Sequence, residues 1–301
     1  MTKQEFSALV KKGPVILDGA TGSNLLKMGM PRGTATELWV EEHPEVIQKL
    51  QAAYLEAGSQ ILYAPTFLAN RIGLQGHGIL ESDLSHKVKT LNHTLVGYTK
   101  EVAAGNVLTD ARKALVAGDI GGTGSFMQPY GPLTYEELLE CYKEQITCLA
   151  EAGVDLLVVE TMISLEETMV VLDAAASVCE LPVLASLTCE ADGSLFFGGN
   201  IFDATSSLAE IGADAVGCNC SVGPDQLEAV VSTIASRVSV PVIAKPNAGM
   251  PVITETGEAV YSMGPEEFAR HMKKLQDAGA SLLGGCCGTG PEYIRAMVGV
   301  L

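Results

Sequence analysis

The sequence is poor in basic residues and has no long apolar run. Its 301 residues include 19 Lys and Arg against 36 Asp and Glu, which gives a formal net charge of −17 at pH 7. Such a surface repels nucleic acids and anionic membranes, so we expect no partner of either kind. No apolar run approaches the roughly 20 residues that cross a bilayer, and residues 1–10 lack the basic and apolar regions of a signal peptide. We therefore expect a cytoplasmic protein without a membrane segment.

The apolar residues, 47% of the chain, are enough for a large core. Short β-branched runs alternate with longer amphipathic segments, which is typical of parallel strands covered by helices. Eight such units predict an α/β fold, the (β/α)8 TIM-type barrel, as a single domain over residues 1–301, with an open doubly wound sheet as the alternative. The predicted strands are Val15–Leu17, Gln60–Tyr63, Ala114–Ala117, Leu156–Val159, Val183–Leu187, Ala215–Cys218, Val242–Ala244 and Ser281–Leu283.

Amphipathic periodicity predicts the helices between these strands, and several of them end at a glycine that tolerates the left-handed conformation. The segment 73–106 is longer than one strand-to-strand connection needs, so we expect an extra helical excursion there. The predicted helices are Pro44–Ala57, Tyr135–Ala152, Leu165–Val178, Asp203–Ile211, Pro224–Ser236 and Pro265–Ala278.

Three cysteines fall where a barrel places its active site, at the carboxyl ends of the strands. Cys220 follows the sixth predicted strand, and Cys286 and Cys287 follow the eighth, whereas none of the five histidines lies at a strand end. Three thiolates leave a fourth coordination position open, which is the arrangement of a catalytic zinc site. Burial as small apolar residues and a Cys286–Cys287 disulfide are the alternatives. We expect Cys218 to point away from Cys220.

Two carboxylates, Asp18 and Glu160, follow the first and fourth predicted strands without an obvious basic partner inside the barrel. An amino group of the substrate is one candidate for the missing positive charge, and capping of a helix is the alternative role. Lys245 ends the seventh strand, where a Schiff-base lyase would place its lysine, although it could also form an ion pair.

The strand ends carry six motifs: Asp18-Gly19-Ala20-Thr21-Gly22, Gly118-Asp119-Ile120-Gly121, Glu160-Thr161, Gly217-Cys218-Asn219-Cys220, Lys245-Pro246-Asn247-Ala248-Gly249 and Gly284-Gly285-Cys286-Cys287-Gly288. Together they resemble the homocysteine S-methyltransferase family over about residues 14–300. The stretch 118–137 looks most like the homocysteine-binding barrel of cobalamin-dependent methionine synthase.

The resemblance implies an enzyme that moves a methyl group to the thiolate of homocysteine and so forms methionine. It implies that Cys220, Cys286 and Cys287 are the catalytic ligands of Zn²⁺, and that Asn247 approaches the metal when substrate is absent. The substrate-binding residues that it implies are Asp18, Gly19, Ala20, Thr66, Glu160 and Asn247.

The methyl donor is the least determined part of this expectation. The chain contains no Asp-x-His-x-x-Gly cobalamin signature, so we expect methylcobalamin carried by a separate corrinoid protein that acts in trans. The alternative donors are S-adenosylmethionine, S-methylmethionine and betaine. Two further alternatives are a Schiff-base lyase that uses Lys245 and a non-catalytic, zinc-stabilised binding module.

Overall fold

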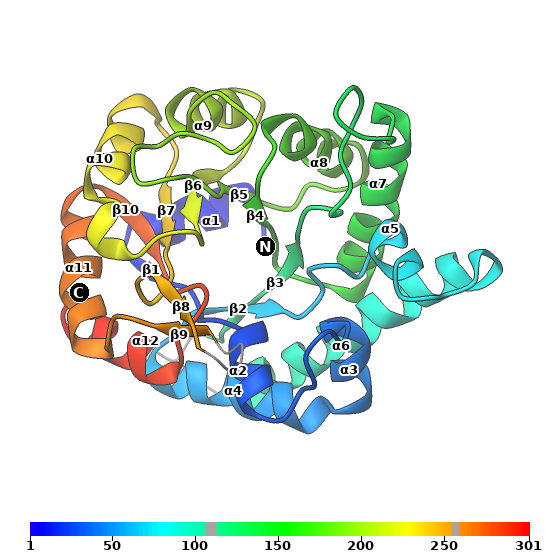
Figure 1. Ribbon diagram of the computed structural model, residues 1–301, viewed down its shortest axis with the longest axis horizontal. Coiled ribbons are helices and arrows are strands. Elements are labelled where there is room, and N and C mark those ends of the chain that lie inside the picture. Colours follow the sequence, from blue (N-terminus) through cyan, green and yellow to red (C-terminus); the bar gives the residue numbers. More distant parts are fainter. Residues whose placement is uncertain (106–112, 255–258) are drawn as a thin grey trace.

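The computed structural model describes residues 1–105, 113–254 and 259–301. Parallel strands surround a central axis, and helices form a ring outside them (Figure 1). The eight-stranded sheet has the order β1-β10-β7-β6-β5-β4-β3-β2, so the predicted (β/α)8 barrel is confirmed. Its strands are β1 (Val15–Ile16), β2 (Ile61–Ala64), β3 (Leu115–Ile120), β4 (Leu156–Met162), β5 (Val183–Leu187), β6 (Ala215–Asn219), β7 (Val242–Lys245) and β10 (Ala280–Leu283).

Gln60 closes the ring between β1 and β2. Its backbone N–H donates to the Ile16 carbonyl at 2.7 Å, and its Oε1 accepts the Ile16 N–H at 3.0 Å. The strands are apolar because both of their faces are buried, one against the helices and one inside the barrel. Alternate residues such as Leu156 and Val158 of β4 form an inner apolar cluster, while Leu157 and Val159 belong to the outer core. This alternation decides which side chains reach the barrel axis.

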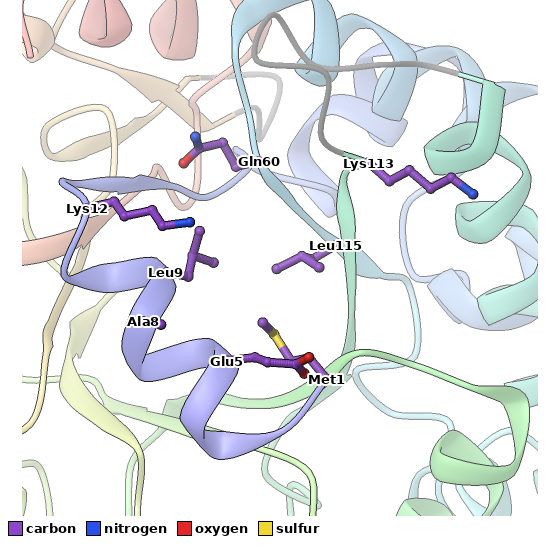
Figure 2. A pocket seen from close by; sticks show the side chains of 8 residues that line it. All are labelled: Met1, Glu5, Ala8, Leu9, Lys12, Gln60, Lys113 and Leu115. Carbon is purple, nitrogen blue, oxygen red and sulfur yellow. The ribbon is translucent and has the colours of Figure 1, made fainter.

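A short helix, α1 (Lys3–Val10), covers the amino-terminal end of the barrel. A capping box of Thr2 and Glu5 starts it, and Phe6 packs into the inner cluster. A cavity of about 400 Å³ lies between this helix and the strand starts (Figure 2). It is at the opposite end from the carboxyl ends of the strands. Its lining residues are Met1, Glu5, Ala8, Leu9, Lys12, Gln60, Lys113 and Leu115.

Local signals fix the helix ends. Thr134 and Glu137 form a capping box at the start of α7, and Gly153, with φ 79°, ends it. Three helices, α4, α7 and α8, have the predicted bounds. The helices that surround the barrel are α2 (Gly22–Lys27), α3 (Thr36–Glu42), α4 (Pro44–Ala57), α6 (Leu84–Gly105), α7 (Tyr135–Ala152), α8 (Leu165–Val178), α9 (Ile201–Glu210), α10 (Glu228–Arg237), α11 (Pro265–Asp277) and α12 (Pro291–Val298).

Other helices differ from the prediction. The Asn200 side chain accepts the Asp203 N–H, so α9 begins at Ile201 rather than at Asp203. The segment predicted as Pro224–Ser236 is divided into the 3₁₀ helix η2 (Pro224–Gln226) and α10. The segment 73–106 contains part of α5 (Arg71–Gln75), η1 (Glu81–Asp83) and α6; Asn106 lies outside the described residues. Because α6 contacts β2, β3, α4 and α7, it is one of the helices of the outer ring.

A small antiparallel hairpin, β8 (Pro251–Ile253) with β9 (Ala259–Tyr261), lies beside the carboxyl ends of the strands (Figure 1). The sequence did not predict it. Val252, Ile253 and Val260 of this hairpin are exposed. Among the described residues, no helix combines the length and the apolar composition that a bilayer crossing requires.

Candidate active site

The three predicted cysteines meet at the mouth of the barrel, the open end formed by the carboxyl ends of the strands. The Sγ atoms of Cys220, Cys286 and Cys287 all lie within 4.8 Å of one another. We call these residues the cysteine cluster. Cys220 follows β6 and the other two follow β10, and β7 separates these strands in the barrel. The fold therefore joins residues that are far apart in the sequence.

The backbone after β6 turns Cys220 into the mouth. In this strand Ala215 faces the inner cluster and Cys218 the outer core, so regular alternation would also turn residue 220 outward. Cys220 instead has φ 64° and Ser221 has φ 56°, both in the left-handed region. Cys218 thus points away from the cluster, as predicted, while Cys220 joins it.

Two backbone contacts hold the cluster against the end of β7. The Cys220 N–H donates to the Lys245 carbonyl at 3.2 Å, and the Cys286 N–H donates to the Pro246 carbonyl at 2.7 Å. Gly288 has φ +83°, and a Cβ there would lie 2.3 Å from the Tyr261 ring. Glycine is therefore required directly after the cysteine pair.

The thiols of the cluster lie within hydrogen-bonding contact of one another, and these contacts shift their pKa values. Hydrogen bonds from Cys220 and Cys286 lower the pKa of the Cys287 thiol to about 3. The same contacts raise the pKa of Cys220. A metal ion replaces the thiol protons when it binds, because thiolates are its ligands. Within the described part of the chain these three convergent sulfurs have no fourth protein ligand; such a set fits Zn²⁺ and leaves one position for a further ligand.

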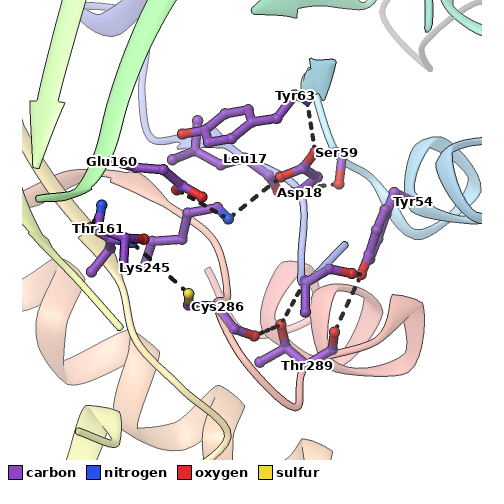
Figure 3. Close-up of polar contacts among 12 residues, drawn as sticks. Leu17, Asp18, Tyr54, Ser59, Tyr63, Glu160, Thr161, Lys245, Cys286 and Thr289 are labelled. Atoms are coloured by element: carbon purple, nitrogen blue, oxygen red, sulfur yellow. Dashed lines mark hydrogen bonds and ion pairs between the residues drawn. The ribbon is translucent and has the colours of Figure 1, made fainter. Parts of the chain in front are cut away.

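The expectation that Asp18 and Glu160 lack a basic partner is wrong. Lys245 Nζ lies 3.7 Å from Asp18 Oδ1 and 3.5 Å from Glu160 Oε2 (Figure 3). The ammonium also lies 4.7 Å from the centre of the Tyr63 ring. Its position follows from strand alternation, since Ile243 faces the inner cluster and Lys245 comes two residues later.

Carboxylates still outnumber the lysine. Asp18, Asp119 and Glu160 are 2%, 7% and 8% exposed, and they surround one buried ammonium, that of Lys245. Among the described residues, Asp119 Oδ1 has no hydrogen-bond partner, and Asp18 Oδ1 and Glu160 Oε2 have only their longer ion pairs with Lys245. Burial raises the pKa of Asp18 to about 7, against the opposing effect of Lys245, and it also raises the pKa of Asp119 and of Glu160. A further buried cation would relieve this excess of negative charge.

Lys245 is held as an ammonium. Burial by itself lowers the pKa of Lys245, but the carboxylates of Glu160 and Asp18 outweigh it and raise the pKa above the ordinary value. A Schiff-base lysine needs the opposite shift, because only the free amine is nucleophilic. The geometry therefore favours the ion-pair role of Lys245 over the lyase alternative.

Gly19 and Ala20 pack closely against Tyr54. A Cβ at position 19 would lie 2.7 Å from the Tyr54 hydroxyl oxygen, which donates to the Ala20 carbonyl at 2.7 Å. The Ala20 N–H donates to Thr289 Oγ1 at 3.2 Å. Thr289 also donates to the Cys286 carbonyl at 2.7 Å (Figure 3). Residues 19 and 20 are thus connected to the loop that carries the cysteine pair.

Thr66 and Asn247 are both buried at strand ends, in different surroundings. Thr66 Oγ1 donates to the Asp119 carbonyl at 2.8 Å and accepts the Asp119 N–H at 3.1 Å, so it joins the ends of β2 and β3. The Asn247 N–H donates to the Val222 carbonyl at 3.1 Å. Asn247 Oδ1 has no hydrogen-bond partner among the residues that the structure describes, which leaves it available to a bound group.

Comparison with known proteins places the chain in a family. Residues 15–301 match the homocysteine S-methyltransferase family. The chain belongs to this family. Methionine synthase of Mycobacterium leprae is 29% identical over 290 residues, which are 92% of this chain and 23% of that protein. The chain thus spans about a quarter of the length of the methionine synthases that it matches.

Other members of the family match along most of their length. Homocysteine S-methyltransferase 4 of Zea mays is 28% identical over 306 residues, which are 95% of this chain and 88% of that one. The metallated form of the homocysteine methyltransferase MmuM from Escherichia coli superposes with a TM-score of 0.80 at 24% identity and covers 97% of both chains. This structural likeness supports the barrel fold.

Two residues of the site in this member of the homocysteine S-methyltransferase family were not predicted from the sequence. Asp119 adds a third carboxylate to Asp18 and Glu160. Asn219 contacts Thr161, which follows Glu160, and also Cys286 of the cysteine cluster. A signal for Asp119 was present, because Leu115, Ala117 and Asp119 alternate along β3 and the first two belong to the inner cluster. The same signal was present for Asn219, which lies four residues after the inner-cluster residue Ala215 in β6.

Proposed function

We propose that this chain methylates homocysteine, with the cysteine cluster holding Zn²⁺ and the buried acids holding the amino group of the substrate. The observation that carries the proposal is the presence of both groups in one barrel mouth: three sulfurs within 4.8 Å of one another, and buried carboxylates with oxygens that lack a hydrogen-bond partner among the described residues. The family match supports homocysteine as the acceptor.

Each group of residues then has a chemical role. Zn²⁺, when bound, lowers the pKa of a coordinated thiol and keeps the thiolate nucleophilic. Cys220, Cys286 and Cys287 supply the three anionic ligands. Asp18 Oδ1 and Glu160 Oε2 accept hydrogen bonds from the substrate ammonium, which offsets part of the excess negative charge. Lys245 forms ion pairs with the same two oxygens and so holds both acids in place.

The reaction exchanges two bonds. The bond between the methyl group and its donor breaks, and a bond between that carbon and the homocysteine sulfur forms. The thiol proton leaves to solvent before methyl transfer, and methionine dissociates. We also propose a cytoplasmic location, because an open site of three thiols requires a reducing compartment.

We further propose that the donor is a methylated corrinoid protein acting in trans. One observation supports it: the chain matches methionine synthases, over about a quarter of their length. The mouth of the barrel would have to admit the corrinoid to the substrate sulfur.

A donor screen tests both levels of the proposal. Zinc-loaded protein and homocysteine are incubated with free methylcobalamin, a methylated corrinoid protein, S-adenosylmethionine, S-methylmethionine or betaine, and methionine is quantified. We expect slow methylation with free methylcobalamin and faster methylation with the corrinoid protein. Turnover with only a sulfonium donor or betaine would refute the corrinoid protein as the donor, while homocysteine would remain the acceptor. No methionine with any donor would favour the non-catalytic binding module.

A further inference from the structure

Two strained backbone segments lie at the ends of β4 and β6. Among the residues that the structure describes, three non-glycine residues have left-handed φ values: Thr161 at 57°, Cys220 at 64° and Ser221 at 56°. A β-branched residue such as threonine adopts this region rarely. Strain of this kind persists only where surrounding contacts impose it. Some contact must therefore hold both segments.

The strained end of β4 is outside the regular ladder. Residues of β4 pair with β5 up to Val159, opposite Ala185, and the register then shifts before Met162 pairs with Leu187. Glu160 and Thr161 lie within this irregular stretch. Strand alternation turns Glu160 inward, but regular pairing with β5 does not hold the backbone at residues 160 and 161, so another contact must hold it.

The Asn219 side chain supplies that contact. The Thr161 N–H donates to Asn219 Oδ1 at 2.8 Å, and Asn219 Nδ2 donates to Thr161 Oγ1 at 2.7 Å. The two bonds fix both the backbone and the side chain of Thr161. Ser186 Oγ also donates to Asn219 Oδ1 at 2.8 Å. Asn219 is 1% exposed, so these bonds form away from competing water.

The same residue contacts the cysteine cluster. Asn219 directly precedes the strained Cys220, and its carbonyl accepts the Thr188 hydroxyl at 3.0 Å. Its Nδ2 lies 3.9 Å from Cys286 Sγ, within the distance of a hydrogen bond to sulfur. One amide group thus contacts the neighbour of a substrate-binding acid and one of the sulfurs.

We infer that Asn219 is a positioning residue that couples the two halves of the site, the acid that recognises the amino group and the thiolates that hold the metal. This inference rests on the proposed function and goes beyond it. Without the Asn219 amide, Thr161 would relax and turn Glu160 away, and Cys286 would lose a donor that orients its sulfur. Loss of an outer partner of a metal ligand typically lowers metal affinity about 10- to 100-fold.

The test measures two quantities for each variant by calorimetry. The first is the affinity for zinc alone. The second is the amino-group preference, the ratio of the dissociation constants of 4-mercaptobutyrate and homocysteine, which differ only in the amino group. We expect Asn219→Ala to lower each by about tenfold or more. Glu160→Gln should lower only the amino-group preference. Cys220→Ser should lower primarily the affinity for zinc.

A second substitution isolates the strain. Glycine adopts the φ of Thr161 without cost, so adding Thr161→Gly to Asn219→Ala should restore most of the amino-group preference while zinc affinity stays low. Ser186→Ala is the matched control, because it removes one bond to Asn219 Oδ1 without touching either strained segment; we expect both quantities to stay within about threefold of the parent, as for a single neutral hydrogen bond. Thermal unfolding confirms that each variant is folded.

The possible outcomes distinguish failure of the coupling through Asn219 from failure of the proposed function. If Asn219→Ala changes only one of the two quantities, or neither, the coupling is refuted. If Ser186→Ala lowers zinc affinity and the amino-group preference as much as Asn219→Ala does, the effect reflects a general loosening of the packing around Asn219, and the inference fails. If Thr161→Gly restores nothing, strain does not direct Glu160. If the parent protein shows no amino-group preference or binds no zinc, the proposed function itself is refuted.

Discussion

Lys245→Met removes the one ammonium among the three buried carboxylates of Asp18, Asp119 and Glu160. Lys245 Nζ lies 3.7 Å from Asp18 and 3.5 Å from Glu160. At an effective dielectric constant of about 20, each contact is worth roughly 4–5 kcal/mol of Coulomb attraction. Desolvation opposes this gain, and removal of one partner from a buried ion pair typically costs about 3–5 kcal/mol. We expect a loss of that size in the free energy of unfolding at pH 8.5.

The loss should shrink as the pH falls. Burial already raises the pKa of Asp18 to about 7 while Lys245 acts to lower it, so the pKa rises further in the variant. The folded variant then holds a proton that the unfolded chain, with an ordinary aspartate pKa, has released. Its stability is therefore highest at low pH and falls as the pH rises through the folded pKa. At pH 5.5 the variant should lie closer to the parent than at pH 8.5.

Urea unfolding at the two pH values, with matched zinc content, measures the difference. Lys273→Met on the surface of α11 is the control, because Lys273 pairs with Asp277 in an exposed i,i+4 contact. Such pairs contribute less than about 1 kcal/mol. A Lys245→Met protein as stable as the parent at pH 8.5 would show that the ion pairs contribute nothing. A large loss that is the same at both pH values would refute the role of carboxylate protonation.

Three further predictions concern the metal and the substrate. Cys220→Ser should lose bound zinc in elemental analysis, whereas Cys218→Ser, in the outer core, should keep it; full occupancy in the first variant would exclude this ligand. Glu160→Gln should weaken homocysteine binding by about 10- to 100-fold, the cost of a lost charged hydrogen bond, and leave zinc content unchanged; equal zinc loss would contradict a role confined to the substrate. The preference for homocysteine over 4-mercaptobutyrate should grow as the pH rises through about 7, because Asp18 then loses its proton; a flat ratio between pH 6 and 8.5 would argue against that assignment.

The positions of the strands could be predicted because each is a short apolar run between polar segments. Val183–Leu187 has the predicted bounds, and the others differ at their ends by at most a few residues. The meeting of Cys220 with Cys286 followed from the same reasoning, since the carboxyl ends of barrel strands converge. Composition and order alone therefore located the candidate metal site.

An ion-pair role of Lys245 was one of the alternatives open from the sequence, but its partners Asp18 and Glu160 lie on other strands of the barrel. Strand alternation places Lys245, Glu160 and Asp119 on the inner face, each two residues after an inner apolar residue. The contacts of Asn219 do not follow from strand alternation alone. They depend on left-handed φ values at Thr161 and Cys220, which these residue types disfavour and local sequence preference does not predict.

The floor of the barrel limits how molecules move through it. Phe6 of α1 and the inner apolar residues fill the interior below the site, as in other barrels of this type, which have packed cores rather than pores. Under the proposed function, homocysteine enters, the methyl donor approaches and methionine departs through one opening. These events have to follow one another in order, so a slowly departing product would inhibit the enzyme by blocking the next donor encounter.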